Sequence, residues 1–234
     1  MAFIRPFKPA DTEDCKAICR ETLPPSLACS PAAVTMAPYL WTLQFTHLFP
    51  EHCFVLDDGK GFVVGYVIGA PDVFALAEKY PRYVEEVLKS EQGLKDVPVP
   101  KQLEVLEAWN IPDGKEEGRM VVNAESMAQN AYKVEWLVLD GAEGKRQLVE
   151  GWRAMLHIDI LEGWQGQGWG RKMVERFVES VKGVKEEGRW DVGKGIQLGV
   201  AAENTKVIGF YEKLGFRVYP GGEKEGVVWM VRDV

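Results

Sequence analysis

Four glycines are crowded into a segment that joins a predicted strand to a predicted helix. The strand is MLHIDIL, residues 155–161, in which apolar and polar side chains alternate. The helix follows, with apolar residues at helical spacing from Met173 to Val181. Glycine is unfavourable in a helix and is used where backbone must lie close to another group. We therefore expect a strand, a bare turn and a helix in sequence, with a ligand against the turn formed by Gly163, Gly166, Gly168 and Gly170.

The start of such a helix is suited to binding a pyrophosphate. Its first turn leaves backbone N–H groups without partners, and the helix dipole adds partial positive charge. Glycines remove the Cβ atoms that would keep an anion away, and Arg171 and Lys172 add positive charge. The alternative is a plain connection between a strand and a helix, with no ligand.

Two common nucleotide motifs fit this turn poorly. A P-loop ends in Gly-Lys-Ser/Thr, whereas this turn ends in Gly170-Arg171-Lys172. The dinucleotide fingerprint G-x-G-x-x-G needs an acidic residue about 20 positions later, at the end of a second strand. At that distance this sequence still predicts helix or loop, so both interpretations are weakened.

The first part of the chain predicts a strand, two helices and a hairpin. Residues 2–8 form a strand that Pro6 restricts to a sheet edge. A helix begins at Asp11 or Thr12 and ends near Thr22, and a second helix covers about Pro31 to Leu48. CFVLDD and FVVGYVIGA, separated by a glycine-containing turn, predict paired strands.

The end of the chain predicts a strand, a helix and two closing strands. GIQLGVAA has the pattern of a buried strand, and Asn204 is suited to cap the helix that follows. Gly215 is expected to end that helix. FRVYP and VVWMV then predict the closing strands.

Residues 72–150 are less regular. FALAEKYPRYVEEVLKS predicts a helix, KQLEVLEAWN is a weaker helical candidate, and Pro98, Pro100 and Pro112 interrupt the pattern. We interpret 72–150 as an insertion in a single domain spanning 1–234, with a role as a mobile lid as one option.

Composition limits the classes of function. The chain has 234 residues, 46% hydrophobic and 27% charged, and a formal net charge of -7. The sequence has no long basic run of the kind that would indicate nucleic-acid binding. No apolar stretch has the length of a signal peptide or of a membrane span. Cysteines 15, 19, 29 and 53 have no second metal-ligand pair, so we predict reduced cysteines and no metal. We expect a cytoplasmic protein, with the nucleus as an alternative.

The motif Gln165-x-x-Gly168-x-Gly170 resembles the coenzyme A loop of the GCN5-related N-acetyltransferase (GNAT) family. GVAAENTKVIGFYEKLGFRVY is similar to the later part of that family, with Tyr-x-x-x-Gly-Phe on Tyr211, Gly215 and Phe216. The resemblance covers about residues 1–72 and 151–234. It implies an α/β (α+β) GNAT fold, with a mixed central sheet of six to seven strands flanked by helices and a helical insertion before the fourth strand.

A closer resemblance connects CFVLDD, VVGYVIGAPD and LHIDILEGWQGQGWGRK with the acetyltransferase-like domain found in, and related to, O-GlcNAcase proteins. Some of those domains have doubtful activity. A catalytically silent CoA-binding module with a recognition role is therefore an alternative to an enzyme, and a structural interaction protein whose turn binds nothing is a third.

The family resemblance also implies a site for acetyl-CoA, where the strand ending near Leu161 diverges from the strand at 195–200. The backbone at Ile158, Ile160 and Leu161 would face pantetheine and the acetyl carbonyl. Asn204 matches a pantetheine contact, and Tyr211 matches the general acid and a cofactor contact. The pyrophosphate would lie on the turn formed by Gln165, Gly166, Gln167, Gly168, Trp169, Gly170, Arg171 and Lys172.

The chemistry of direct transfer is consistent with these positions. A phenol with a pKa of about 10 is protonated at neutral pH and can donate to a departing thiolate. An alkylamine with a pKa of about 10.4 must lose a proton before it attacks. Asp159 and His157 share a strand face beside the expected acetyl group, and either could take that proton, directly or through water. A mutual hydrogen bond that merely satisfies both polar groups is the alternative.

We therefore predict an acetyl-CoA-dependent N-acetyltransferase. Its acceptor would be a primary amine on a small molecule, a peptide or a protein. A homodimer is one option for its assembly.

Overall fold

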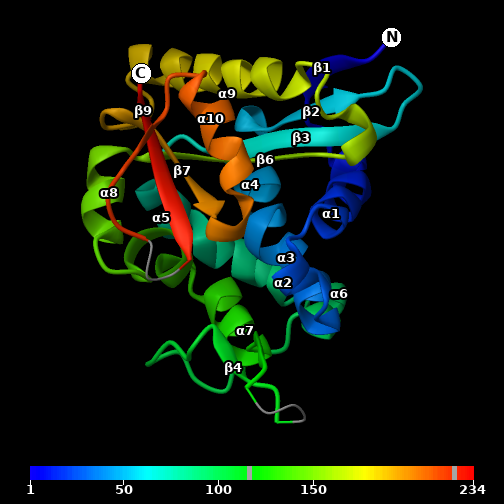
Figure 1. The fold of residues 1–234 in the computed structure, drawn as a ribbon, viewed down its shortest axis with the longest axis vertical. Helices are drawn as coiled ribbons and strands as arrows, with labels where there is room; N and C mark the ends of the chain where they lie inside the picture. The colour runs from blue at the N-terminus through cyan, green and yellow to red at the C-terminus, as the bar shows by residue number, and fades with distance from the viewer. Residues whose placement is uncertain (115–117, 223–225) are drawn as a thin grey trace.

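A mixed seven-stranded sheet forms the centre of the molecule (Figure 1). The computed structural model describes residues 1–114, 118–222 and 226–234. The strand order is β1-β2-β3-β6-β7-β9-β8, which confirms the predicted fold class and places the helical segment before β6, the fourth strand of this sheet. The strands are β1 (Phe3–Pro6), β2 (Phe54–Asp57), β3 (Val63–Ala70), β6 (Ala154–Ile160), β7 (Gly195–Ala201), β8 (Arg217–Val218) and β9 (Val227–Asp233), and a separate hairpin is formed by β4 (Asn110–Pro112) and β5 (Met120–Val122).

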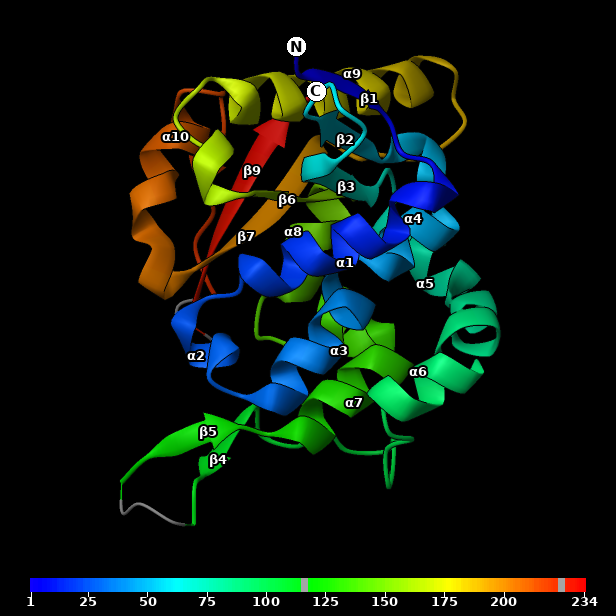
Figure 2. The same cartoon turned by 90° about the vertical axis from the view of Figure 1, so that its right-hand side faces the viewer.

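Helices cover both faces of the sheet (Figure 2). The α-helices are α1 (Thr12–Glu21), α2 (Pro25–Ala28), α3 (Pro31–Trp41), α4 (Leu43–Leu48), α5 (Val73–Tyr83), α6 (Glu91–Asp96), α7 (Ala124–Tyr132), α8 (Lys145–Gly151), α9 (Trp169–Glu186) and α10 (Ile208–Glu212). Short 3₁₀ turns are η1 (Pro9–Asp11), η2 (Pro50–His52), η5 (Glu162–Trp164) and η6 (Ala202–Val207), and π-helical turns are η3 (Val84–Leu88) and η4 (Trp136–Asp140).

Helix α9 packs on one face of the sheet. Its predicted apolar side is buried, and Phe177 lies in one hydrophobic cluster with Leu56 of β2 and Leu156 of β6. Gly69 of β3 permits this close approach, because a Cβ there would lie 2.8 Å from the Phe177 ring and 2.0 Å from the Met155 carbonyl oxygen.

The opposite face is covered by the N-terminal helices and by much of residues 72–150. Tyr80 of α5 and Met127 of α7 belong to the same buried cluster as Ile18 of α1 and Met36 of α3. In the described residues, the insertion is therefore part of the core, whereas its role as a lid stays a prediction. The β4–β5 hairpin projects from the end of the molecule farthest from α9 (Figure 2).

The helix predicted over Pro31–Leu48 is wrong in one respect, because it is broken between α3 and α4. Thr42 leaves helical geometry, with φ −124° and ψ −61°. Pro38 lacks the N–H that would bond to the preceding turn, which already weakens the helix there. Thr42 is fully buried, and its hydroxyl lies 3.4 Å from the hydroxyl of Tyr66 on β3.

The weaker helix candidate at 101–110 is also wrong. Side-chain amides bond the backbone groups that a helix would have paired internally. Gln102 Oε1 accepts from the N–H groups of Glu104 and Val105 at 2.8 and 2.9 Å. Gln129, buried on α7, donates to the carbonyl oxygens of Gln102 and Val105. These local bonds compete with helix formation.

A third, smaller cluster joins α8 to β9 and encloses a lysine. Leu148, Trp229 and Val231 are buried there. The ammonium of Lys145 lies 3.4 Å from Gln197 Oε1 and 5.7 Å from the centre of a Trp229 ring. Burial lowers the Lys145 pKa from its ordinary value of 10.5 to about 8.

This lysine predicts a pH-dependent stability. Between pH 8 and 10.5 the folded chain has lost the Lys145 proton while the unfolded chain still binds it, so the contribution of Lys145 to stability rises with pH across that window. Lys145→Met removes the titration. We expect the variant to be more stable below pH 8, by up to about 3 kcal/mol, with the advantage vanishing towards pH 10.5.

The measurement is urea unfolding at a series of pH values. Lys182→Met, at an exposed position of α9, is the matched control and should follow the wild type. A constant difference between Lys145→Met and wild type from pH 7 to 11 would contradict this account.

Candidate active site

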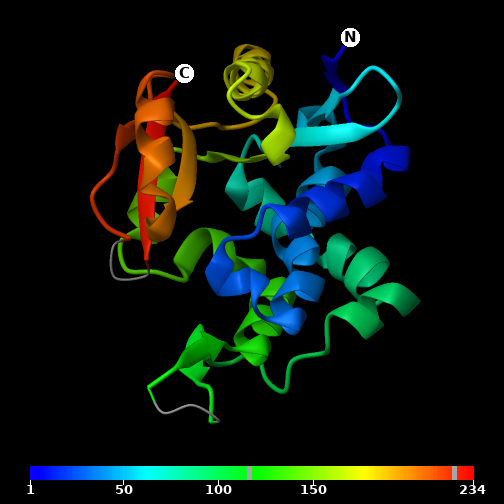
Figure 3. The ribbon, with the colours of Figure 1, turned by 45° about the vertical axis from the view of Figure 1, so that its right-hand side comes forward.

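Strands β6 and β7 pair only where both begin. Parallel pairing joins Ala154 to Ile196 and Met155 to Gln197. The other edge of β6 continues to pair with β3 as far as Ile160, and β7 pairs with β9 along its whole length. Beyond those first pairs, in the described residues, the facing edges of β6 and β7 share no ladder. Figure 3, in which α9 is seen nearly end-on, shows α9 between the β7–β9–α10 group and β1–β3.

The strands diverge at the place that the sequence predicted for acetyl-CoA. Unpaired backbone groups at a strand edge are free to bond a ligand, and leaving them buried without partners would be costly. Leu161, just beyond β6, is different, because its N–H already donates to the Val64 carbonyl oxygen at 3.0 Å. Backbone contacts to a ligand are therefore expected mainly from residues 156–160.

The glycine-rich turn connects the end of β6 to α9. Gly166 and Gly168 have φ values of 73° and 82°, which L side chains rarely adopt, and Gly168 is the N-cap of α9. A Cβ on Gly163, Gly166 or Gly168 would have no atom within 4 Å, so this side of the turn is open. As a glycine, the N-cap Gly168 supplies no side-chain cap, which leaves the first N–H groups of α9 available on that side.

Gly170 serves a different purpose from the other three glycines. A Cβ there would lie 3.1 Å from Cζ of Phe210 and 3.8 Å from Cδ1 of Ile160. Gly170 therefore lets the first turn of α9 approach α10, which carries Phe210 and Tyr211.

Two glutamines brace the turn from within. Gln165 Nε2 donates to the Ile160 carbonyl oxygen at 2.7 Å, and Gln167 Nε2 donates to the Gly163 carbonyl oxygen at 2.8 Å. Both amide groups are used to hold the backbone, so these side chains shape the turn.

Positive charge lies at the start of α9. Trp169 is the first residue of the helix, and the Lys172 ammonium lies 4.5 Å from its ring centre. Arg171 is exposed, with its Nε 3.8 Å from Glu175 Oε1. The turn thus combines open backbone N–H groups with two cations, the combination expected of an anion site.

His157 and Asp159 lie on the opposite face of β6 from Ile158 and Ile160, as predicted. His157 Nε2 is 3.0 Å from Asp159 Oδ2, and their side chains are 36% and 19% exposed. The two side chains considered together from the sequence are therefore in direct polar contact. The pair is also partly open to solvent, as a group that exchanges protons with a substrate must be.

Tyr66 was missed by the sequence reasoning. It is the register partner of Asp159 on β3, and its hydroxyl donates to Asp159 Oδ2. The available signal was one tyrosine in the otherwise aliphatic strand VVGYVIGA, on the strand that pairs with MLHIDIL.

Tyr211 lies on α10, 9% exposed, packed against the rings of Phe210 and Phe216. Gly215, with φ 81°, ends this helix as predicted, and the Phe216 N–H donates to the Tyr211 carbonyl oxygen. Burial raises the pKa of the Tyr211 phenol above its usual range, and the negative charge of Asp159 raises it further. Tyr211 therefore lies within electrostatic reach of Asp159 and remains a proton donor at neutral pH.

Asn204 does not cap a helix, so that prediction is wrong. It is exposed within the 3₁₀ turn η6, with φ −108° and ψ 36°. The turn occupies residues 202–207, and α10 begins only at Ile208, which is why Asn204 lies too early to be its cap. The preceding residue, Glu203, accepts a 2.7 Å hydrogen bond from Ser26 of α2.

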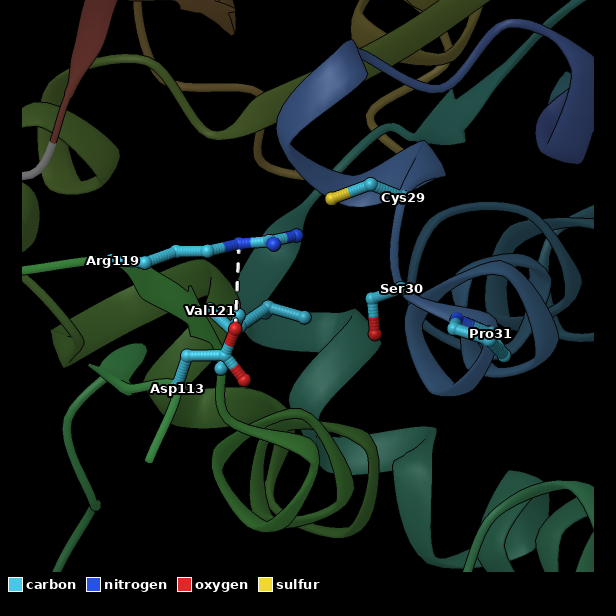
Figure 4. Close-up of a pocket in the computed structure, with 7 residues that line it drawn as sticks. Cys29, Ser30, Pro31, Asp113, Arg119 and Val121 are labelled. Carbon is cyan, nitrogen blue, oxygen red and sulfur yellow. Dashed lines mark ion pairs between the residues drawn. The ribbon is translucent and has the colours of Figure 1, made fainter. Parts of the chain in front are cut away.

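A separate cavity of about 400 Å³ lies between the α2–α3 junction and the β4–β5 hairpin (Figure 4). None of the residues predicted for acetyl-CoA or for catalysis lines it. The Arg119 Nε atom lies 3.5 Å from Asp113 Oδ2 beside it. The cavity is lined by Cys29, Ser30, Pro31, Asp113, Arg119, Val121 and Val122.

Two further predictions concern metals and membranes. Within residues 1–114, 118–222 and 226–234, no group of His, Cys, Asp and Glu is arranged to hold a metal ion. In the same residues, no helix combines the length and apolarity needed to cross a membrane. The four cysteines are free thiols, and Cys15, Cys19 and Cys53 are buried.

Comparison with known proteins supports the same class. The sequence profile of the acetyltransferase (GNAT) domain matches residues 116–218. The crystal structure of SsHAT is similar to this chain with 26% identity and a TM-score of 0.73, covering 99% of this chain and 98% of SsHAT. PH1933 from Pyrococcus horikoshii OT3 shares the fold, with 13% identity, a TM-score of 0.54 and coverage of 100% of this chain and 99% of PH1933.

The seven-stranded sheet with its diverging central strands, the profile match and the similarity to SsHAT agree: the chain is a GNAT-type acetyltransferase. That class uses acetyl-CoA as cosubstrate. The residues present suit such a molecule, because the unpaired edge of β6 leads to an open glycine turn at the N-terminus of α9.

The turn generates a binding prediction. Gly168→Val forces a side chain onto a backbone with φ 82° and places it on the open side of the turn. We expect acetyl-CoA binding, measured by calorimetry, to weaken at least about tenfold.

Gly188→Val is the matched control, because Gly188 also has positive φ and open surroundings but follows the other end of α9. It should carry a similar conformational cost and bind acetyl-CoA as the wild type does. Equal affinity in Gly168→Val and Gly188→Val would argue against this turn as the phosphate site.

Proposed function

We propose that this protein is an N-acetyltransferase that moves the acetyl group of acetyl-CoA directly to a primary amine. The observation that carries the proposal is the divergence of β6 from β7, with a proton donor, Tyr211, and a proton acceptor, the His157–Asp159 pair, within electrostatic reach of each other. The reaction needs both functions, one for the departing thiolate and one for the attacking amine.

The binding part of the proposal rests on backbone. Residues 156–160 of β6 supply N–H and C=O groups that no neighbouring strand uses on the β7 side, although the Ile160 carbonyl oxygen already accepts from Gln165. The N–H groups at the start of α9, with Arg171 and Lys172, bind the pyrophosphate. Asn204 is exposed on the turn after β7, where it can contact pantetheine without capping a helix.

The His157–Asp159 pair takes the proton from the acceptor amine. Asp159 Oδ2 accepts a hydrogen bond from Tyr66 and lies 3.0 Å from His157 Nε2, and within the described residues its Oδ1 accepts no hydrogen bond. The proton reaches either this free carboxylate oxygen or the other nitrogen of the His157 ring, directly or through water. The negative charge also favours a cationic acceptor.

Tyr211 supplies the proton on the other side of the reaction. As the amine nitrogen forms its bond to the acetyl carbon, the carbon–sulfur bond breaks, and the phenol protonates the thiolate. Backbone N–H groups of β6 stabilise the oxyanion that forms between these steps. No cysteine nucleophile is required, so the transfer is direct.

A catalytically silent CoA-binding module is the second candidate. It follows from the closer resemblance to the O-GlcNAcase-related domains, which the comparisons do not support and which stays a prediction. That candidate predicts acetyl-CoA binding without turnover for any amine. A cytoplasmic or nuclear location and a homodimer likewise stay predictions.

Turnover of acetyl-CoA against small amines, amino sugars and peptides tests the proposal, and Tyr211→Phe sharpens the test. The variant removes one oxygen while the ring still packs between Phe210 and Phe216. We expect kcat/KM to fall by about 10²–10⁴-fold, while acetyl-CoA affinity is retained. Because the Tyr211 pKa is raised, wild-type activity should decline through phenol ionisation only above about pH 10.

Tyr219→Phe, on another tyrosine of the C-terminal segment, is the control and should leave the rate unchanged. A wild-type rate in Tyr211→Phe, with the same decline at high pH, would assign Tyr211 to packing alone. Acetyl-CoA binding with no turnover of any amine would favour the silent module.

We also propose that residues 72–150 help to choose the acceptor. The α2 segment contacts both the turn after β7 and the cavity beside the β4–β5 hairpin. Ser26 donates a hydrogen bond to Glu203 on that turn, and Cys29, just after α2, lines the cavity. Removing the whole insertion would open the core, since α5 and α7 are part of it. A single substitution in the cavity is therefore the sharper test.

Val121→Trp fills the cavity from the hairpin (Figure 4). We expect the KM for a peptide acceptor to rise at least about tenfold while acetyl-CoA affinity is unchanged, because the change excludes acceptor volume only. Met120→Trp, at the exposed neighbouring position, is the control. An unchanged acceptor profile in Val121→Trp would exclude the cavity from acceptor binding.

A further inference from the structure

Tyr66 is placed behind the proton-accepting pair. It is fully buried on β3, directly opposite Asp159 in the antiparallel register. Its hydroxyl donates to Asp159 Oδ2, the same oxygen that His157 Nε2 approaches at 3.0 Å. The Tyr66 and His157 ring centres lie 5.9 Å apart. The carboxylate is thus held by two groups from two strands.

The direction of these hydrogen bonds follows from proton count. A phenol has one proton, and Asp159 as a carboxylate can only accept, so Tyr66 donates to Asp159. The Thr42 hydroxyl, 3.4 Å from the Tyr66 oxygen and fully buried, must then donate to Tyr66. Burial, and then the charge of Asp159, raise the Tyr66 pKa well above its usual range, so the donor keeps its proton.

The break between α3 and α4 provides Thr42, the third side chain in the hydrogen-bonded series Asp159, Tyr66, Thr42. Thr42 lies where α3 ends and α4 begins, and its non-helical backbone is part of that break. A valine would fill the same volume in an apolar core, and a phenylalanine would fill that of Tyr66. Packing alone therefore does not explain why two hydroxyl groups are buried here. Burying a hydroxyl is costly unless it is hydrogen-bonded, and these two are bonded towards Asp159.

We propose that Tyr66, oriented by Thr42, is a positioning residue that fixes the Asp159 carboxylate and, through it, the His157 ring for proton transfer. This rests on the proposed function of the same site. With Oδ2 hydrogen-bonded to Tyr66 and 3.0 Å from His157 Nε2, Asp159 presents its remaining oxygen in one orientation. A carboxylate in contact with His157 alone could rotate, and its productive orientation would be populated less.

Tyr66→Phe tests the inference. We expect kcat to fall about tenfold or more, the scale of one hydrogen bond to a charged group, with acetyl-CoA affinity unchanged. Thr42→Val should shift kcat in the same direction by less, because the Tyr66–Asp159 bond remains. The matched control is Tyr80→Phe, which removes another buried tyrosine hydroxyl, one that donates to the Ala131 carbonyl oxygen. It should lose comparable stability and keep kcat.

Nitrogen-15 NMR of the histidine rings supplies a readout that does not need turnover. The chain has three histidines, so His47 and His52 serve as internal references. At one fixed pH, the ring resonances of His157 should move in Tyr66→Phe and stay in place in Tyr80→Phe.

The outcomes separate this inference from the proposed function. If the wild type acetylates no amine, the proposed function fails by itself, and an unmoved His157 resonance in Tyr66→Phe overturns the positioning role as well. If the wild type is active, a Tyr66→Phe variant with the kcat of Tyr80→Phe overturns the inference even where the His157 resonance moves. Loss of kcat together with a moved His157 resonance supports it.

Discussion

The hydrogen-bonding edge that β6 turns towards β7 is the constraint on which the site depends. Ladder partners from β7 reach only Ala154 and Met155, although β6 continues to Ile160. Backbone groups left in this way require partners, and a ligand that lies along the strand can supply them. A thioester bound along this edge would lie between chemical groups from both halves of the sheet.

The other parts of the site are arranged around that opening by packing. Gly69 and Gly170 allow α9 to lie close to β3 and α10, which brings the N-terminus of α9 to the end of β6. Helix α10 carries Tyr211 on the β7 side, and β6 carries Asp159 on its other face. The proposed proton donor and acceptor therefore come from different elements, and the charge of Asp159 raises the Tyr211 pKa.

Sequence predicted those parts whose signals are local. Alternation in MLHIDIL gave the faces of β6, and glycine spacing predicted the turn before α9. The break at Thr42 and the irregular path of residues 101–110 depend on contacts with Tyr66 and Gln129, which lie far away in the chain. The role of Tyr66 was missed for the same reason, because strand register becomes visible only once β3 and β6 are paired.

Hydrogen–deuterium exchange tests the central claim, that the unpaired edge of β6 binds the cosubstrate. Exchange would be followed in peptides covering residues 156–160 and, as a reference, β2, with and without CoA. The account predicts that CoA slows exchange in 156–160 and at the start of α9, while β2 is unaffected. Bound CoA that protects neither segment would contradict it.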